Sequence, residues 1–113
     1  MTATLDINQV NIVLHQASQA AVEASTKSYA EIGERDACGF AWVRVYKVRI
    51  NSKVGKALVA VGFRKAWNGG LELWNPGQHG TQSVSVKEAG AIVYATYLKG
   101  QLGLDASAGS RLD

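Results

Sequence analysis

A long amphipathic segment near the N-terminus constrains the fold more than any other feature of this sequence. Between residues 6 and 32, apolar or small side chains recur in steps of three and four, the spacing of a helix that packs along one face. Thr4 or Asp6 supplies a capping oxygen at its start, and Gly33 is a natural stop at its end. The seam consists of Ile7, Val10, Leu14, Ala17, Ala21, Ala24 and Ser28. Either this seam covers the chain's own sheet, or part of it packs on a second copy, and we expect a homo-oligomer.

The segment 37–50 has the composition and the period-two alternation of a β-strand. Its two faces are Cys38, Phe40, Trp42, Arg44, Tyr46, Val48 and Ile50 on one side, and Gly39, Ala41, Val43, Val45, Lys47 and Arg49 on the other. Both faces are apolar in the first half, which predicts a central strand covered on both sides there. The second half is basic and is expected to face solvent. Trp42 and Trp74 are expected in the core, where Trp in a small sheet usually lies.

The remaining chain alternates short elements with turn signals. Asn51 or Ser52 caps a predicted helix over 53–61, and Asn68-Gly69-Gly70 joins a predicted hairpin of 63–67 and 71–74. A capping box at Ser85 opens a third helix that ends at Leu102. Its expected core face is Ala89, Ile92, Val93 and Thr96. The tail, 104–113, is either a final edge strand or a mobile flap.

These elements predict an α/β (α+β) fold with a long N-terminal helix, a small and mostly antiparallel sheet, and two further helices. We expect one domain, 1–113, in which 1–33 is the helix and a possible oligomerisation element and 37–113 is the α/β core. Cys38 is the single cysteine, which excludes an intrachain disulfide. The N-terminus lacks the pattern of a secretory signal, and no apolar run reaches the roughly 20 residues of a membrane span, so we expect no membrane partner.

Catalytic and metal chemistry find little support in the sequence. His15 and His79 have no acid, cysteine or second histidine at ligand spacing, and no nucleophile signature surrounds Cys38. A Walker-type loop at 53–57 is rejected because the upstream glycine is missing and Ala57 stands where Ser or Thr is required. We therefore expect a protein that is not an enzyme, with no catalytic residues, no metal site and no cofactor.

An acid-free basic segment indicates an anionic ligand. Between Arg44 and Lys65 there is no Asp or Glu, although the net charge of the chain is only +3. Cations near exposed rings suit a ligand that carries both phosphate and a base. We expect Arg44, Lys47, Lys53, Arg64, Lys65 and Arg111 to neutralise phosphate, Trp67 to stack the base, and Asn75 and Gln82 to orient it.

Several of these residues also have simpler interpretations. Trp67 can be a core residue, Asn75 and Gln82 can serve turn and helix-entry chemistry, and Lys53 can lie on a solvated helix face. Arg111 can pair with an acid such as Asp113 or Asp36.

Five stretches of the sequence resemble a group of small, largely uncharacterised proteins encoded by tailed phages. They are residues 37–43 (ACGFAWV), 53–57 (KVGKA), 73–76 (LWNP), 87–91 (KEAGA) and 108–113 (AGSRLD). The resemblance spans most of the chain from Ala37 onward and implies a phage accessory protein, a host-takeover or anti-defence factor, in the cytoplasm of a bacterial host. It implies no catalytic residues.

Three functions follow as hypotheses. The first is non-catalytic binding or sequestration of a phosphate-bearing nucleotide. The second is nucleic-acid binding by the same basic patch, and the third is a protein-interaction module that inhibits a host enzyme.

Overall fold

The long N-terminal helix is present as the sequence predicts. The computed structural model describes residues 6–34 and 36–113, and Thr4, the alternative cap, lies outside them. Helix α1 spans Ile7–Ile32, and the Asp6 carboxylate accepts a hydrogen bond from the Asn8 N–H (3.0 Å). The helix ends at Gly33, whose φ of 60° lies in the region that favours glycine.

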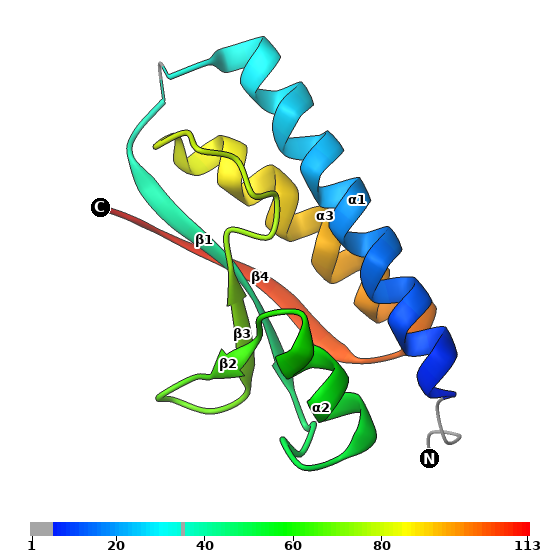
Figure 1. Ribbon diagram of the computed structural model, residues 1–113. Coiled ribbons are helices and arrows are strands. Elements are labelled where there is room, and N and C mark those ends of the chain that lie inside the picture. The colour runs from blue at the N-terminus through cyan, green and yellow to red at the C-terminus, as the bar shows by residue number, and fades with distance from the viewer. Residues whose placement is uncertain (1–5, 35) are drawn as a thin grey trace.

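Helix α1 packs mainly on helix α3, which spans Val84–Leu102 (Figure 1). The middle of the predicted seam is buried, whereas Ile7, Ala24 and Ser28 at its ends are only half-buried. The buried residues of α1 are Val10, Val13, Leu14, Ala17, Ala21 and Ser25. The chain's own α3 therefore occupies the seam, and self-association through α1 stays a prediction.

Four strands form one antiparallel sheet in the order β2-β3-β1-β4 (Figure 1). The strands are β1 (Gly39–Tyr46), β2 (Arg64–Lys65), β3 (Leu71–Trp74) and β4 (Asp105–Leu112). Strand β1 is central, as predicted, and the predicted hairpin is formed by β2 and β3. The C-terminal tail is an edge strand, which decides between the two alternatives that the sequence left open.

The predicted strand 37–50 is too long at both ends. Strand β1 stops at Tyr46 because Lys47 adopts a φ of 63°, which turns the chain out of the sheet. Helix α2 (Lys53–Ala60) follows at once, and the Ser52 hydroxyl caps it by accepting from the Gly55 N–H (3.0 Å). A Cβ on Gly55 would collide with the carbonyl oxygen of Arg49, so only glycine lets α2 pack so closely on this turn.

The helices cover one face of the sheet. Ala41, Val43 and Val45 of β1 are buried on the helix side, in one core with residues of all three helices. The opposite face carries Phe40, Trp42, Arg44 and Tyr46, and none of the three described helices lies on it (Figure 1). The expectation that β1 is covered on both sides is therefore wrong, and the aromatic residues of β1 border solvent.

The cap of helix α3 is Ser83, two residues before the predicted cap at Ser85. The Ser83 hydroxyl accepts from the Val86 N–H, while the Asp36 carboxylate accepts from the Ser83 hydroxyl (3.0 Å) and from the Ser85 N–H (2.7 Å). The side chain and the backbone N–H of Ser85 are the main groups that lower the pKa of Asp36 to about 2. An acid distant in the sequence therefore fixes where α3 begins.

The predicted core face of α3 is wrong. Ile92 and Thr96 are exposed, and Ala89 and Val93 are only half-buried. The buried residues are Val84, Val86, Gly90, Ala91, Tyr94, Ala95, Leu98 and Leu102. Helix α3 lies between α1 and the sheet, so it is buried on two sides. Its buried surface is therefore broader than the single stripe that the sequence predicted.

Candidate ligand-binding face

Aromatic side chains lie together on the open face of the sheet. Trp42 and Trp74 are directly opposite in the register of β1 and β3, with ring centroids 5.0 Å apart, and Phe40 lies 5.7 Å from Trp74. Tyr46 continues the same side of β1. We call Phe40, Trp42, Tyr46 and Trp74 the aromatic face. Trp74 is 43% exposed and Tyr46 is 37% exposed, so these rings present surface to solvent.

A glycine on β4 makes room for the Trp42 indole. Gly109 pairs with Trp42 in the sheet register. A Cβ at Gly109 would lie 2.6 Å from the indole nitrogen of Trp42, closer than any real contact. The indole therefore extends across β4 in the space that a side chain at residue 109 would fill.

Cations border these rings. The Arg111 guanidinium lies 5.4 Å from the Phe40 ring centroid and 5.8 Å from that of Trp74. The Lys87 ammonium, which donates to the Gly39 carbonyl (2.9 Å), lies 5.2 Å from the Phe40 ring. All three cation–ring distances are within the range of cation–π attraction. One end of the aromatic face therefore carries two positive charges on rings that remain partly exposed.

Arg44 is held by an acid in the middle of the sheet. Its guanidinium donates to Glu72 (2.6 Å) and to the Tyr46 hydroxyl (3.4 Å), and the Trp74 indole N–H donates to Glu72 (2.9 Å). Burial alone would raise the pKa of Glu72, but the hydrogen bonds from Trp74 and Arg44 outweigh it, and that pKa lies below its ordinary value. The Tyr46 and Glu72 hydrogen bonds raise the pKa of Arg44. Arg44 therefore positions the aromatic face and is largely neutralised by Glu72.

The hairpin carries the most exposed aromatic residue. Trp67 is 94% exposed, at a turn that the Ala66 N–H closes by donating to the Gly70 carbonyl (2.9 Å). Lys65 is exposed beside it. Arg64 is exposed too, but its guanidinium donates to the carbonyls of Phe63 (2.8 Å) and Val59 (3.3 Å). The core interpretation of Trp67 is wrong, and its ring is free to stack.

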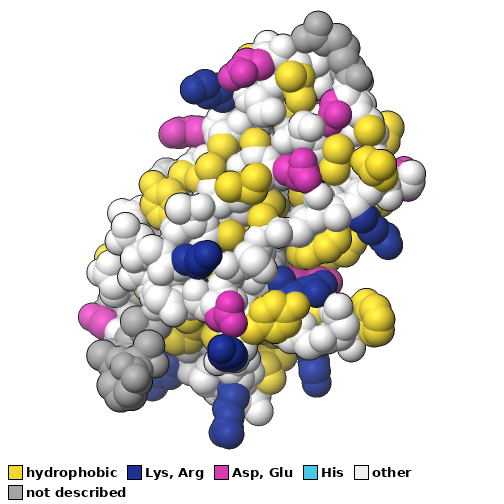
Figure 2. All heavy atoms as spheres, turned by 180° about the vertical axis from the view of Figure 1, so that it is seen from behind, with side chains coloured by type: hydrophobic (Ala, Val, Ile, Leu, Met, Phe, Trp, Pro, Cys, Tyr) yellow, Lys and Arg dark blue, Asp and Glu magenta, His cyan; other side chains and the backbone are white. Residues whose placement is uncertain are grey.

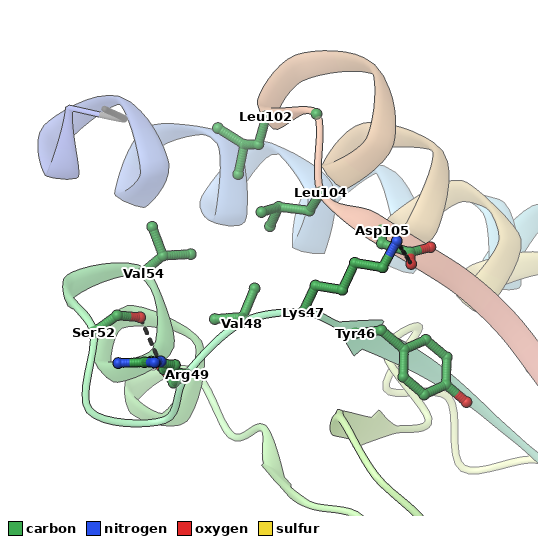
Figure 3. Close-up of a pocket in the computed structure, with 10 residues that line it drawn as sticks. Tyr46, Lys47, Val48, Arg49, Ser52, Val54, Leu102, Leu104 and Asp105 are labelled. Carbon is green, nitrogen blue, oxygen red and sulfur yellow. Dashed lines mark hydrogen bonds and ion pairs between the residues drawn. The ribbon is translucent and has the colours of Figure 1, made fainter. Parts of the chain in front are cut away.

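A hollow of about 660 Å³ lies where the ends of β1, α2 and α3 meet (Figure 3). Lys47 crosses its rim toward Asp105 (3.7 Å), and Arg49 lies beside Ser52. The aliphatic side chains in it are Val48, Val54, Leu102 and Leu104, which turn toward one another (Figure 3). The hollow combines an apolar interior with two cations at its rim.

The nine predicted ligand residues do not surround one cavity. Arg44 and Arg111 lie on the open sheet face, Lys47 lies at the hollow, and Lys53 is exposed at the first turn of α2. The hairpin holds Arg64, Lys65 and Trp67. In the half of the molecule that contains α2 and this hairpin, Figure 2 shows most of the Lys and Arg side chains on the face it presents. These cations form a broad basic end of the molecule.

The two predicted amide residues lie apart from the basic end. Asn75, with a φ of 50°, donates to the His79 carbonyl (3.0 Å), and the Gln82 amide oxygen accepts from the Cys38 thiol (3.4 Å). Both hydrogen bonds hold the loop between β3 and α3. This is the turn and helix-entry chemistry that the sequence left open as their second interpretation.

Sequence reasoning missed Phe40, Trp42, Trp74 and Lys87 as surface residues. Alternation along β1 places Phe40 and Trp42 on one face, but no signal in the sequence indicates which face the helices cover.

Comparison of the chain with protein-family models, curated sequences and solved structures gives no match. Within residues 6–34 and 36–113, no helix is long and apolar enough to cross a membrane. In the same part of the chain, no group of three or more His, Cys, Asp or Glu is placed to hold a metal ion. The functional proposal therefore stands on the geometry of the aromatic face.

Proposed function

We propose that this chain is a non-catalytic binding protein whose aromatic face holds a single strand of nucleic acid. The supporting observation is that Trp74 contacts both Phe40 and Trp42 on a sheet face that none of the described helices covers, with the Arg111 guanidinium above Phe40 and Trp74. Every base has a flat π-face, so exposed rings bind single strands by stacking. This is the second of the three hypotheses from the sequence, but the main stacking rings are now Phe40, Trp42 and Trp74 and no longer Trp67 alone.

The dimensions of the face fit a short stretch of strand. From Phe40 to Tyr46 the strand rises about 20 Å, at roughly 3.3 Å for each residue. Four-stranded sheets that bind RNA through exposed aromatic residues stack two or three bases. The three contacting rings offer a surface for that number of bases, and Trp67 offers a further ring at the hairpin tip.

Cations gather at one end of this track, where Arg111 and Lys87 lie beside Phe40. Lys65 pairs with Leu71, which is buried on the helix side, so the Lys65 side chain points away from the aromatic face. Arg64 pairs with Glu72, but its guanidinium donates to the carbonyls of Phe63 and Val59, and the charge of Arg44 is offset by Glu72. A strand that runs along β1 would therefore meet positive charge at the Phe40 end and stacking surface beyond it.

The hollow supports a second candidate, the binding of one phosphate-bearing nucleotide. Lys47 and Arg49 supply positive charge at its rim, and its volume is within the range of small-molecule sites. The Lys47–Asp105 pair is long and exposed, so a phosphate could displace it at little cost. Sequestration of a nucleotide there is the first of the hypotheses from the sequence. The sequence resemblance supports a phage accessory protein in a bacterial host cytoplasm as the setting for either ligand.

Fluorescence anisotropy with labelled single-stranded DNA and RNA tests the first candidate. We expect the Trp74→Ala substitution to weaken binding by about 1–3 kcal/mol, the contribution of one stacked base, or roughly 5- to 150-fold in Kd. Tyr29→Ala is the control, because Tyr29 is similarly exposed but lies on α1.

Two results would contradict this proposal. One is the absence of single-strand binding by the unmodified protein at low salt. The other is a folded Trp74→Ala protein that binds as well as the unmodified chain. Thermal stabilisation by mononucleotides that is lost on Lys47→Ala and kept on Trp74→Ala would favour the hollow instead.

A further inference from the structure

Strand β4 has no strand partner on its outer side among residues 6–34 and 36–113. It is the last strand in the order β2-β3-β1-β4, and it spans eight residues, Asp105–Leu112. It contains no proline or lysine, the residues that commonly protect sheet edges. A long, regular edge of this kind is a template for pairing with another strand.

The direction of the free backbone groups follows from the register. The Ala41 carbonyl accepts from the Asn75 N–H (2.8 Å) on the β3 side, so odd-numbered residues of β1 turn their peptide groups away from β4. Even-numbered residues of β1 face β4, as the bond from the Asp113 N–H to the Cys38 carbonyl (3.0 Å) shows. Their partners on β4 are odd-numbered. The outward peptide groups of β4 are therefore those of Ala106, Ala108, Ser110 and Leu112, of which the Ala106 N–H already donates to the Leu104 carbonyl (3.0 Å).

The sequence of β4 is complementary to itself in one antiparallel register. If Ala108 faces the partner's Ala108 across a two-fold axis, Ala106 faces the partner's Ser110. The Ala108 pair then uses both outward peptide groups, and the Ala106 carbonyl accepts from the N–H of the partner's Ser110, because the Ala106 N–H is held by Leu104. Asp105 then faces the partner's Arg111. Both side chains lie on the open face of the sheet, and facing pairs without mutual backbone bonds are the closer ones.

We propose that two copies of this chain associate through β4 in this register, which extends the two sheets into one. The contact is isologous, and it repeats the Asp105–Arg111 pair on both sides of the axis. Asp105 is available for it, because its contact with Lys47 is long (3.7 Å) and both side chains are exposed. Arg111 forms no salt bridge among the described residues, and its guanidinium would turn from the Phe40 and Trp74 rings toward the partner's Asp105.

Apolar side chains border the same edge on the helix side. Leu112 is 68% exposed and pairs with Gly39, which faces Val84 of α3. Ile92 is 56% exposed and lies one helical turn after Glu88, which hydrogen-bonds with Ser110 of β4. A second copy placed on β4 brings its own α3 beside these residues. Backbone, charge and apolar surface thus all fit the same partner, a second copy of this chain.

The test is the solution mass of the full chain without nucleic acid, measured by light scattering after size exclusion. We expect twice the 12.1 kDa of one chain for the unmodified protein. Asp105→Arg places two arginines opposite each other and should lower the mass to that of one chain. The double variant Asp105→Arg, Arg111→Asp restores opposite charges and should restore the double mass. Circular dichroism checks that each variant is folded.

A single-chain mass for the unmodified protein, a double mass for Asp105→Arg, or a single-chain mass for the folded double variant would each overturn the proposal. A second measurement fixes the register. In a Cys38→Ser background, Ala108→Cys should form a disulfide-linked dimer under mild oxidation, because two-fold-related residues on facing strands lie within disulfide reach. Ala30→Cys, exposed on α1, is the control that should stay unlinked. Equal linkage of both variants would contradict the proposed register.

Discussion

Glu72 links Arg44 to Trp74 of the aromatic face. It accepts from both the Arg44 guanidinium and the Trp74 indole, and its side chain is only 14% exposed. Hydrogen bonds to charged groups in half-buried sites contribute more to the stability of the fold than hydrogen bonds between neutral groups. The orientation of Trp74 therefore depends on an acid that would not itself touch a ligand.

We expect Glu72→Gln to lower the free energy of unfolding at neutral pH by about 1–3 kcal/mol, because it leaves the Arg44 charge half-buried beside a neutral partner. The folded-state pKa of Glu72 is lowered, so its contribution is present above the ordinary value of 4.5 and is lost as the pH falls. Urea denaturation at neutral and acidic pH measures this difference. It should shrink below pH 4.5, and a difference that grows on acidification would contradict the assignment.

Lys47→Gln is the matched control for this prediction. It removes an ion pair whose two side chains are 83% and 52% exposed, and such pairs contribute less than about 1 kcal/mol. The comparison separates the effect of a half-buried pair from the loss of charge alone.

At this scale the sequence predicted the charged residues but not their environment. Arg44 was expected to meet phosphate, yet Glu72, distant in the sequence, neutralises it. Trp42 and Trp74 were expected in the core, because a strand with two apolar faces gives no local signal for which face the helices cover. That choice depends on how α1 and α3 pack against each other.

The contact between α1 and α3 depends on small residues. The Ser25 hydroxyl donates to the Val86 carbonyl (2.8 Å), and Gly77 and Gly90 fit around it. A Cβ on Gly90 would lie 2.6 Å from the Ser25 oxygen and 2.8 Å from the Gly77 Cα. The backbone atoms cannot move aside as a flexible side chain would, so this site tolerates no added methyl group without a shift of the helices.

We expect Gly90→Ala to destabilise the fold by about 1–3 kcal/mol through overpacking. Gly100→Ala in the same helix should instead stabilise it by up to about 1 kcal/mol, because alanine has the higher helix propensity. Nothing lies within 4 Å of a Cβ at residue 100. Thermal denaturation of the two variants gives shifts of opposite sign, and a shift of the same sign in both would contradict this description of the packing.

Helix ends were predictable where a capping side chain is adjacent in the sequence. Asp6, Gly33 and Ser52 act where the sequence placed them. The start of α3 was not predictable in the same way, because Asp36 reaches it from a loop distant in the chain. The end of β1 was missed because nothing in the sequence indicates that Lys47 takes a positive φ.

Charge is distributed unevenly over the whole molecule. Figure 2 shows acidic side chains mainly in the half away from α2 and the hairpin, while most cations lie toward those elements. Arg111 and Lys87 add positive charge at the other end of the aromatic face. The local potential along this face therefore favours an anionic strand more than the net charge of +3 suggests.

Single-strand binding should weaken log-linearly as salt increases. With three or four phosphates neutralised, the slope of log K against log salt should be about −2 to −3, at roughly −0.7 for each phosphate. Arg111→Ala should make that slope shallower by about 0.7. Lys27→Ala, exposed on α1, should leave it unchanged. Affinity independent of salt, or an equal effect of both variants, would argue against phosphate contacts by Arg111.

The two faces of the sheet have different roles: one carries the core of the fold, and the other carries the proposed binding surface. The residues that hold the fold together, such as Val43, Val45 and Tyr94, lie toward the helices, while Trp42, Trp74 and Arg111 lie on the other side and add little to that interior. Apart from Glu72 and Gly109, whose roles are structural, residues on the solvent side can therefore change without unfolding the chain. Selection, or a protein engineer, could change what such a scaffold recognises while leaving its architecture intact.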